Sequence, residues 1–114
     1  MKIYIAGKVT GLPIEAAREK FESTEKQLID AGVSASQIVN PMKLGISTDE
    51  TWHCAMEICK QQLEKCTAIY MQYDWRDSFG ARQELTMAQR LRLDTYFEEM
   101  HDIRMIEKLL AAGV

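Results

Sequence analysis

Short apolar runs alternate with amphipathic helical patterns along the whole chain. Runs of the length typical of buried strands occupy residues 2–6, 37–40, 68–72 and 95–97. Between and after them, apolar residues recur every three or four positions, which predicts helices over residues 14–31, 52–66 and 79–91, and from about 99 to 112. Strands and helices are therefore expected to alternate along the whole chain.

This alternation favours parallel strands joined by right-handed crossovers. We expect an α/β fold, a flavodoxin-like or Rossmann-like three-layer sandwich with strand order 2-1-3-4 and helices on both faces of the sheet. In such a sheet, ligands bind at the carboxyl ends of the strands where the winding reverses, here between the first and third strands. Residues 7–11 and 74–80 follow those strands, so we expect one site built from both loops.

Proline and glycine mark the boundaries of several elements. Pro13 suits the first position of a helix, and Gly32 suits the position just after one ends. Pro41 ends the second strand, because proline cannot donate to a sheet. Residues 42–50 are rich in turn and capping types and are predicted as a loop.

Composition and charge narrow the classes of partner. With 46% hydrophobic and 27% charged residues, residues 1–114 are expected to form a single domain. The net charge is −3 and no basic block stands out, so we expect no nucleic-acid polymer, whereas a small-molecule nucleoside or nucleotide needs only local donors. No apolar run approaches ~18 residues, so we expect no membrane segment. A sheet this small leaves part of a helix face apolar, which is compatible with a homodimer.

The three cysteines predict reduced thiols in a cytosol. Cys59 and Cys66 are seven residues apart, or two helical turns, which is too far for two ligands of one metal ion, and His53 and Cys54 face away from them. Cys59 lies on the apolar stripe of its helix and is expected in the core. We therefore expect neither a metal ion nor another cofactor.

The start of the third helix carries the candidate chemistry. Ser78 is a good N-cap residue, and Gly80 in the first helical turn makes sense if something approaches the backbone closely. Free N–H groups at a helix start favour an anion. Glu84 lies one turn beyond Gly80 on the same face, where its carboxylate could attack an anomeric carbon.

A purely structural interpretation of these residues stays open. Ser78 could only cap the helix, Gly80 could only ease packing, and Glu84 could sit on a solvated face. The loop after the first strand is equally ambiguous, because Gly7–Gly11 lacks both common phosphate-binding fingerprints. Lys8 and Thr10 could contact a phosphate or a sugar, or could be ordinary turn residues.

Several segments follow one another in a recognisable order. They are Ile3–Leu12, Asn40–Pro41, Trp52, Cys66, Ile69–Tyr70, and the set Trp75, Ser78, Gly80, Ala81 and Glu84. Over roughly residues 2–97 this order resembles the nucleoside 2-deoxyribosyltransferase-like superfamily. The resemblance is closest to a phage- and prophage-associated branch of unknown function.

This resemblance implies chemistry at an N-glycosidic bond. In the catalytic relatives, the glutamate at the position of Glu84 attacks C1′ of a deoxyribose. A serine six residues earlier, matched here by Ser78, contacts the 5′-phosphate of deoxynucleoside monophosphates. The implied substrate-binding residues are Gly7, Lys8, Thr10, Gly11, Asn40, Trp75, Ser78 and Gly80.

Some positions depart from the pattern of the relatives. The relatives place an aspartate seven residues before the cysteine that precedes the third strand, and here that position is Cys59. A thiol is neither charged near neutral pH nor as good a hydrogen-bond acceptor. Lys8 replaces the usual proline, and Thr67 replaces a second aspartate. Asp74 or Asp77 could take over the missing role.

Three functions follow as hypotheses. The chain could cleave or transfer the N-glycosidic bond of a deoxynucleotide through Glu84. It could instead be a nucleotide-binding module that kept the substrate-binding residues but lost catalytic activity, which the missing aspartate favours. It could also be a protein-interaction domain, for instance a phage factor, since its methionines suit adaptable surfaces.

Overall fold

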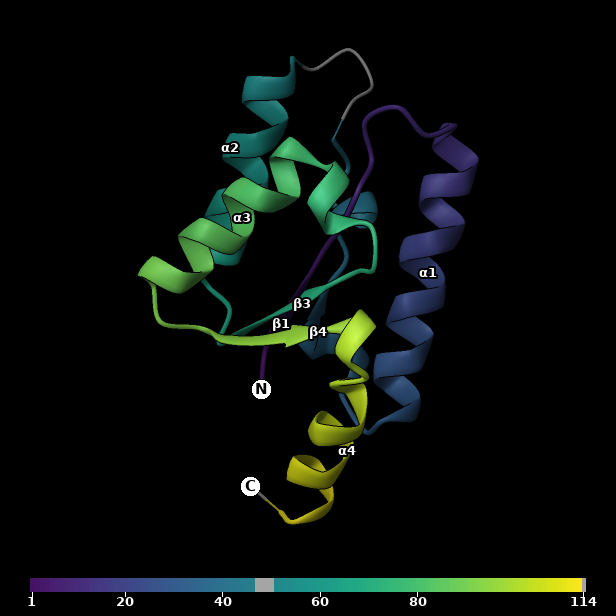
Figure 1. Ribbon diagram of the computed structural model, residues 1–114, viewed down its shortest axis with the longest axis vertical. Helices are drawn as coiled ribbons and strands as arrows, with labels where there is room; N and C mark the ends of the chain where they lie inside the picture. Colours follow the sequence, from purple (N-terminus) through teal and green to yellow (C-terminus); the bar gives the residue numbers. More distant parts are fainter. Residues whose placement is uncertain (47–50, 114) are drawn as a thin grey trace.

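The computed structural model describes residues 1–46 and 51–113, and these form four parallel strands with helices on both faces of the sheet (Figure 1). The strands are β1 (Ile3–Ala6), β2 (Ile38–Val39), β3 (Ala68–Met71) and β4 (Asp94–Phe97). Their order in the sheet is β2-β1-β3-β4, and every neighbouring pair is parallel. The predicted α/β fold, the strand order and the doubly wound topology are therefore confirmed.

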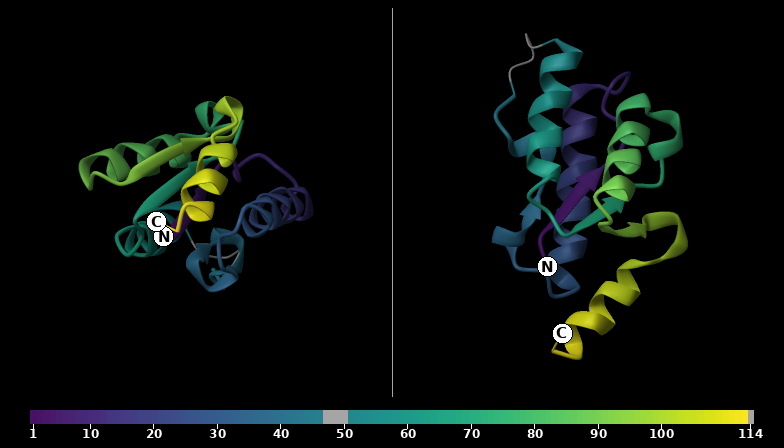
Figure 2. Two further views of the ribbon diagram at one scale, coloured as in Figure 1. Left: turned by 90° about the horizontal axis from the view of Figure 1, so that it is seen from below. Right: turned by 90° about the vertical axis from the view of Figure 1, so that its left-hand side faces the viewer.

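Helices cover the two faces of the sheet in pairs. The helices are α1 (Ile14–Asp30), α2 (Trp52–Leu63), α3 (Phe79–Arg90) and α4 (Ile103–Ala111). Figure 2 shows α1 and α4 on one side of the strands and α2 and α3 on the other. The central strand β1 contributes to both sides, because Ile3 and Ile5 pack toward α1 while Tyr4 and Ala6 pack toward α2 and α3.

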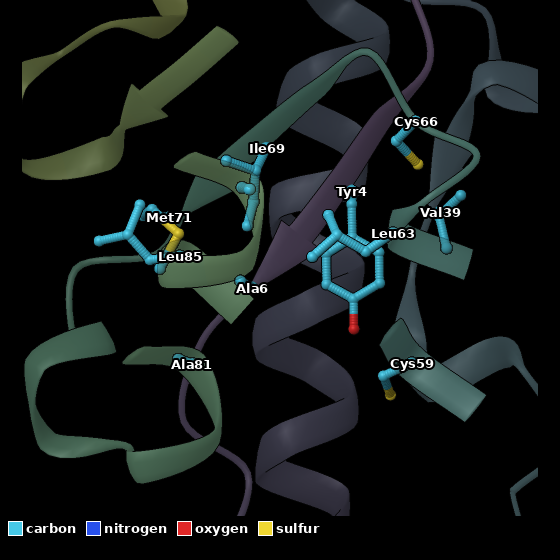
Figure 3. Close-up of a cluster of buried hydrophobic side chains, with 11 residues drawn as sticks. Tyr4, Ala6, Val39, Cys59, Leu63, Cys66, Ile69, Met71, Ala81 and Leu85 are labelled. Carbon is cyan, nitrogen blue, oxygen red and sulfur yellow. The ribbon is translucent and has the colours of Figure 1, made fainter. Parts of the chain in front are cut away.

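The four residues of β1 and the four of β3 are all buried, as expected for parallel strands covered on both faces. Figure 3 shows the cluster between the sheet and the helices α2 and α3, in which Leu63 lies beside the ring of Tyr4 and Leu85 lies beside Met71. Burial on both faces fixes the register of the two central strands. That register determines where the loops after β1 and β3 emerge.

Gly32 ends α1 as predicted. Its φ of +112° is in the left-handed region that glycine favours, and the N–H of Val33 donates to the carbonyl of Leu28 over 3.0 Å. The chain then turns back toward the edge of the sheet, where β2 is confined to Ile38–Val39. Asn40, the last residue of the predicted strand, instead caps the short turn Pro41–Lys43.

The last predicted helix begins later than expected. Residues 98–100 form a separate short turn, and His101 takes a left-handed φ of 55°, so α4 starts only at Ile103. A second prediction is wrong at the end of α3. The helical spacing places Leu91 on the inner face, but this residue is 43% exposed, because α3 ends at Arg90 and the chain turns through a positive φ at Arg92.

The predicted loop over residues 42–50 is only partly described. Its first residues complete the turn Pro41–Lys43, and Gly45 has a φ of +72°. The expected turn residues Ser47, Thr48 and Asp49 lie outside the described residues. Within residues 1–46 and 51–113, no helix combines the length and the apolar character needed to cross a bilayer.

Candidate functional site

A cavity of about 570 Å³ opens where β1 ends and α3 begins. Its lining comes from the loop after β1, from α1, from the residues after Asn40, from α2, and from the first turns of α3. Among the described residues that line it are Gly7, Thr10, Arg18, Met42, Trp52, Met56, Cys59, Asp77, Ser78, Phe79, Gly80 and Glu84. The cavity therefore lies at the reversal of the winding, where ligands bind in sheets of this kind.

The two loops predicted to form one site lie side by side. The backbone N–H of Lys8 donates to Oδ1 of Asp74 over 3.1 Å. Nζ of Lys20, on α1, then donates to Oδ2 of Asp74 over 2.7 Å and to the carbonyl of Lys8 over 2.6 Å. Only 14% of the Lys20 side chain and 11% of the Asp74 side chain are exposed. This largely buried ion pair joins α1 and both loops.

Replacing Asp74 by asparagine should therefore weaken the fold. The Lys20 ammonium would keep its place but lose its counter-charge, and we expect a loss of about 2 kcal/mol in the free energy of unfolding. Urea denaturation measures this loss. Glu15→Gln is the matched control, because the Glu15–Arg18 pair is exposed and should contribute under about 0.5 kcal/mol. Equal effects of the two substitutions would contradict the proposed role of the largely buried pair.

Glu84 is the buried acid of the cavity wall. Only 6% of the residue is exposed, and the hydroxyl of Tyr4 donates to its Oε2. Burial raises the pKa of the Glu84 carboxyl to about 7, although Tyr4 and Lys60 both lower it. The interpretation of Glu84 as a solvated helix glutamate is therefore wrong, and near neutral pH its carboxyl is divided between the protonated and the ionised form.

Tyr4 and Cys59 complete the polar floor around Glu84. Burial raises the pKa of the Tyr4 hydroxyl well above its ordinary value, and the charge of Glu84 raises it further. Burial also raises the pKa of the Cys59 thiol to about 11, so this group is neutral near pH 7. Figure 3 shows Tyr4 directing its hydroxyl toward the end of the cluster where Cys59 lies. The floor thus holds one ionisable acid and two neutral partners.

Ser78 and Gly80 each have a structural role and also face the cavity. Oγ of Ser78 accepts from the N–H of Ala81 over 3.1 Å, so the serine caps α3 as predicted. A Cβ on Gly80 would lie 3.1 Å from Sδ of Met56, which is tighter than ordinary contact. The close approach that Gly80 permits is therefore that of α2, and the same residue leaves room in the wall of the cavity.

Gly7 lines the cavity, but a neighbour within the protein explains why this position is a glycine. A Cβ at this position would lie 1.9 Å from Oε1 of Gln72, which no side-chain adjustment of a few tenths of an ångström can relieve. Gln72 is fully buried and its Nε2 donates to Oγ1 of Thr24 over 2.9 Å. The glycine thus lets the loop after β1 cross the end of β3 closely.

Four of the predicted substrate-binding residues do not line the cavity. Lys8 and Gly11 belong to the same loop, but the backbone of Lys8 is held by Asp74 and Lys20. Asn40 is buried, and its side chain accepts from the N–H of Met42 and donates to Glu25. Trp75 packs against Phe97 and donates to Glu99 over 3.2 Å, away from the cavity. Thr10 does line it, beside Gly7.

The cavity also contains residues that the sequence pattern did not single out. Tyr4 occupies a position typical of a buried strand, so nothing local marked its hydroxyl as a partner of Glu84. The helical spacing places Trp52 on the apolar stripe, but 38% of it is exposed, and its ring lies 5.5 Å from that of Phe79 at the mouth of the cavity. Arg18 adds a positive charge to the wall. Of the two carboxylates suggested to replace the missing aspartate, Asp74 is engaged by Lys20, whereas Asp77 lines the cavity.

Fold and site together define a small doubly wound α/β domain with a buried acid in a cavity at the reversal of its winding. The chain belongs to the family described as Domain of unknown function (DUF4406), whose match covers residues 1–97. The match ends at the last residue of β4, so α4 lies beyond it. Neither the curated proteins nor the solved structures contain a match.

Proposed function

We propose that this protein binds a 2′-deoxynucleotide in the cavity and cleaves or transfers its N-glycosidic bond, with Glu84 as nucleophile. One observation carries the proposal. An acidic side chain that is 6% exposed, with a pKa of about 7 and a hydroxyl donor on Oε2, lines a cavity large enough for a nucleotide. Perturbed acids in such cavities are typical of active sites.

The chemistry takes two steps. A carboxylate oxygen of Glu84 attacks C1′, and the base leaves with the electron pair of the glycosidic bond and takes up a proton from water. Water or a second base then attacks C1′ of the glycosyl ester and releases the Glu84 carboxylate, so the configuration at C1′ is retained. Tyr4 holds the attacking carboxylate in one orientation by donating to Oε2.

The start of α3 suits the phosphate of such a substrate. Ser78 and Gly80 line the cavity at the amino end of a 12-residue helix, where backbone N–H groups and the helix dipole favour an anion. Arg18, which also pairs with Glu15 over 3.0 Å, lines the same cavity and places a cationic side chain there. A 5′-phosphate here would leave the sugar to extend toward Glu84, which lies further along the same helix.

The test is to incubate the wild-type protein with the four deoxynucleoside monophosphates and the matching deoxynucleosides, and to measure free base by chromatography. We expect slow release of base from at least one monophosphate, and slower release from its nucleoside. Thermal shift with the same compounds reports binding separately, since a ligand at 100 times its Kd stabilises by roughly 2.7 kcal/mol. The proposal would be contradicted if no compound released free base and no compound raised the melting temperature.

Cys59 favours a second candidate, a binding module without turnover. It lines the cavity at the position where the catalytic relatives suggested by the resemblance carry an aspartate, and its thiol is neutral because burial raises the pKa to about 11. A neutral thiol cannot assist proton transfer to a leaving base as a carboxyl group does. Thermal stabilisation by a deoxynucleotide without release of base would select this candidate.

A further inference from the structure

A second hollow, the basic groove, runs between α2 and α3. Its lining residues are Lys60, Phe79, Arg82, Gln83, Thr86, Met87 and Arg90, and its volume is about 630 Å³. Three of these side chains are cationic and none is a carboxylate. Among the residues that the structure describes, none of the three cations has an ion-pair partner. The groove is thus a local positive region on a chain of net charge −3.

The cations of the basic groove are spread along its length. Arg82 and Arg90 are eight residues apart on α3, which places them about 12 Å apart along the helix axis. Lys60 comes from α2 and so contributes a third charge from the other wall. One phosphate group cannot reach all three, whereas a chain of phosphates can. The spacing therefore fits a linear polyanion better than a single anion.

The basic groove meets the cavity at an aromatic pair. Phe79 lines both hollows and is 57% exposed, and its ring lies 5.5 Å from that of Trp52, which lines the cavity. The guanidinium of Arg82 lies 5.9 Å from the centre of the Phe79 ring. Exposed aromatic rings beside a cationic groove are the combination on which single-stranded nucleic acids bind, because bases stack while phosphates contact the cations.

We propose that the basic groove binds the sugar–phosphate backbone of single-stranded DNA whose terminal nucleotide enters the cavity. This inference deepens the proposed function and depends on it, because the cavity is taken to hold a deoxynucleotide. The strand crosses the Trp52–Phe79 pair, where one base stacks, and its next phosphates reach Arg82, Lys60 and Arg90. An acidic peptide would use the cations but would leave the aromatic pair without a stacking partner. The composition gives only the net charge of the whole chain, so it could not reveal this local cluster of cations.

Fluorescence anisotropy with a labelled single strand of about six deoxynucleotides tests the proposal. We expect the wild-type protein to bind this strand at least about tenfold more tightly than the strand's terminal monophosphate, which is measured by competition. Between about 50 and about 200 mM salt, a plot of the logarithm of the association constant against the logarithm of the salt concentration should have a slope of about −2. This slope is expected for three neutralised phosphates on a single strand. The double variant Arg82→Glu/Arg90→Glu should lose at least about tenfold in affinity for the strand. Arg104→Glu on the distant helix α4 makes a matched control that keeps wild-type affinity.

The remaining outcomes distinguish a failure of the basic groove from a failure of the proposed function. Equal affinities for the strand and the monophosphate, or wild-type affinity in the Arg82→Glu/Arg90→Glu variant, would overturn the basic groove while leaving the proposed function intact. Displacement of the strand by an equal concentration of poly-glutamate peptide would assign the groove to an acidic protein and overturn the inference. Groove-dependent strand binding without release of base from any nucleotide would overturn the catalytic proposal alone.

Discussion

Replacing Glu84 by glutamine should reduce the release of base at least about a thousand-fold, the loss typical of removing a nucleophile. Glutamine keeps the size of the side chain and can still accept from Tyr4, but its neutral amide cannot form a glycosyl ester. Because the helix and the cavity wall stay intact, binding of the deoxynucleotide should persist. Chromatography of free base measures the loss, and thermal shift shows whether the ligand still binds.

The pH dependence of the same reaction supplies a second readout. The nucleophile must be ionised, and burial raises the pKa of Glu84 to about 7. The value of kcat/KM should therefore rise as the pH increases through about 7 and then level off. Glu107→Gln, a substitution on the exposed surface of α4, controls for the general effect of removing a carboxylate and should keep wild-type rates. Release of base by Glu84→Gln at the wild-type rate would assign the reaction to another group.

The periodicity of the sequence was sufficient to predict the fold because the apolar runs are clearest in the central strands, which are completely buried. The four residues of β1 and of β3 are buried, and such runs are read as strands without knowledge of their neighbours. The alternation with helices then leaves few topologies to choose from. The errors lie at the ends of elements, as at residues 98–100, where a left-handed turn at His101 depends on packing that no local pattern encodes.

The candidate site was predictable only in part. Ser78, Gly80 and Glu84 share one helix, so their spacing already placed them near one another. The partners of these residues come from elsewhere, and pairs such as Tyr4–Glu84 and Lys20–Asp74 are separated by 80 and 54 residues. Contacts of this kind follow from the register of the sheet and from how the helices cross it. A sequence pattern with a period of two or of three to four residues carries no information about them.

The basic groove shows the same limit in another way. Arg82 and Arg90 lie on one side of α3 and could have been recognised as a pair from their spacing alone. Lys60 belongs to α2, and the exposure of Phe79 depends on how α2 and α3 pack. Gly80 sets that packing, since any larger residue would press on Met56. The groove is therefore a property of the assembled helices rather than of either segment.

The contribution of Glu84 to the stability of the wild-type protein should decrease from about pH 4.5 to about pH 7, because Glu84 is harder to ionise in the folded state than in the unfolded chain. The carboxyl of the unfolded chain loses its proton near the ordinary glutamate pKa of 4.5, while burial in the folded protein raises the pKa to about 7. Within this window the folded state binds more protons, so each rise in pH favours unfolding. The difference of about 2.5 pH units corresponds to about 3 kcal/mol of stability lost by about pH 7.5.

Glu84→Gln isolates this contribution, because every other titrating group is shared with the wild type. Urea denaturation at intervals between about pH 4.5 and about pH 8 gives the free energy of unfolding of both proteins. Their difference should change by about 3 kcal/mol in favour of the variant as the pH rises, and should stay constant above about pH 7.5. Parallel profiles for the two proteins would show that Glu84 is ionised at an ordinary pH and is not the buried acid on which the proposed chemistry depends.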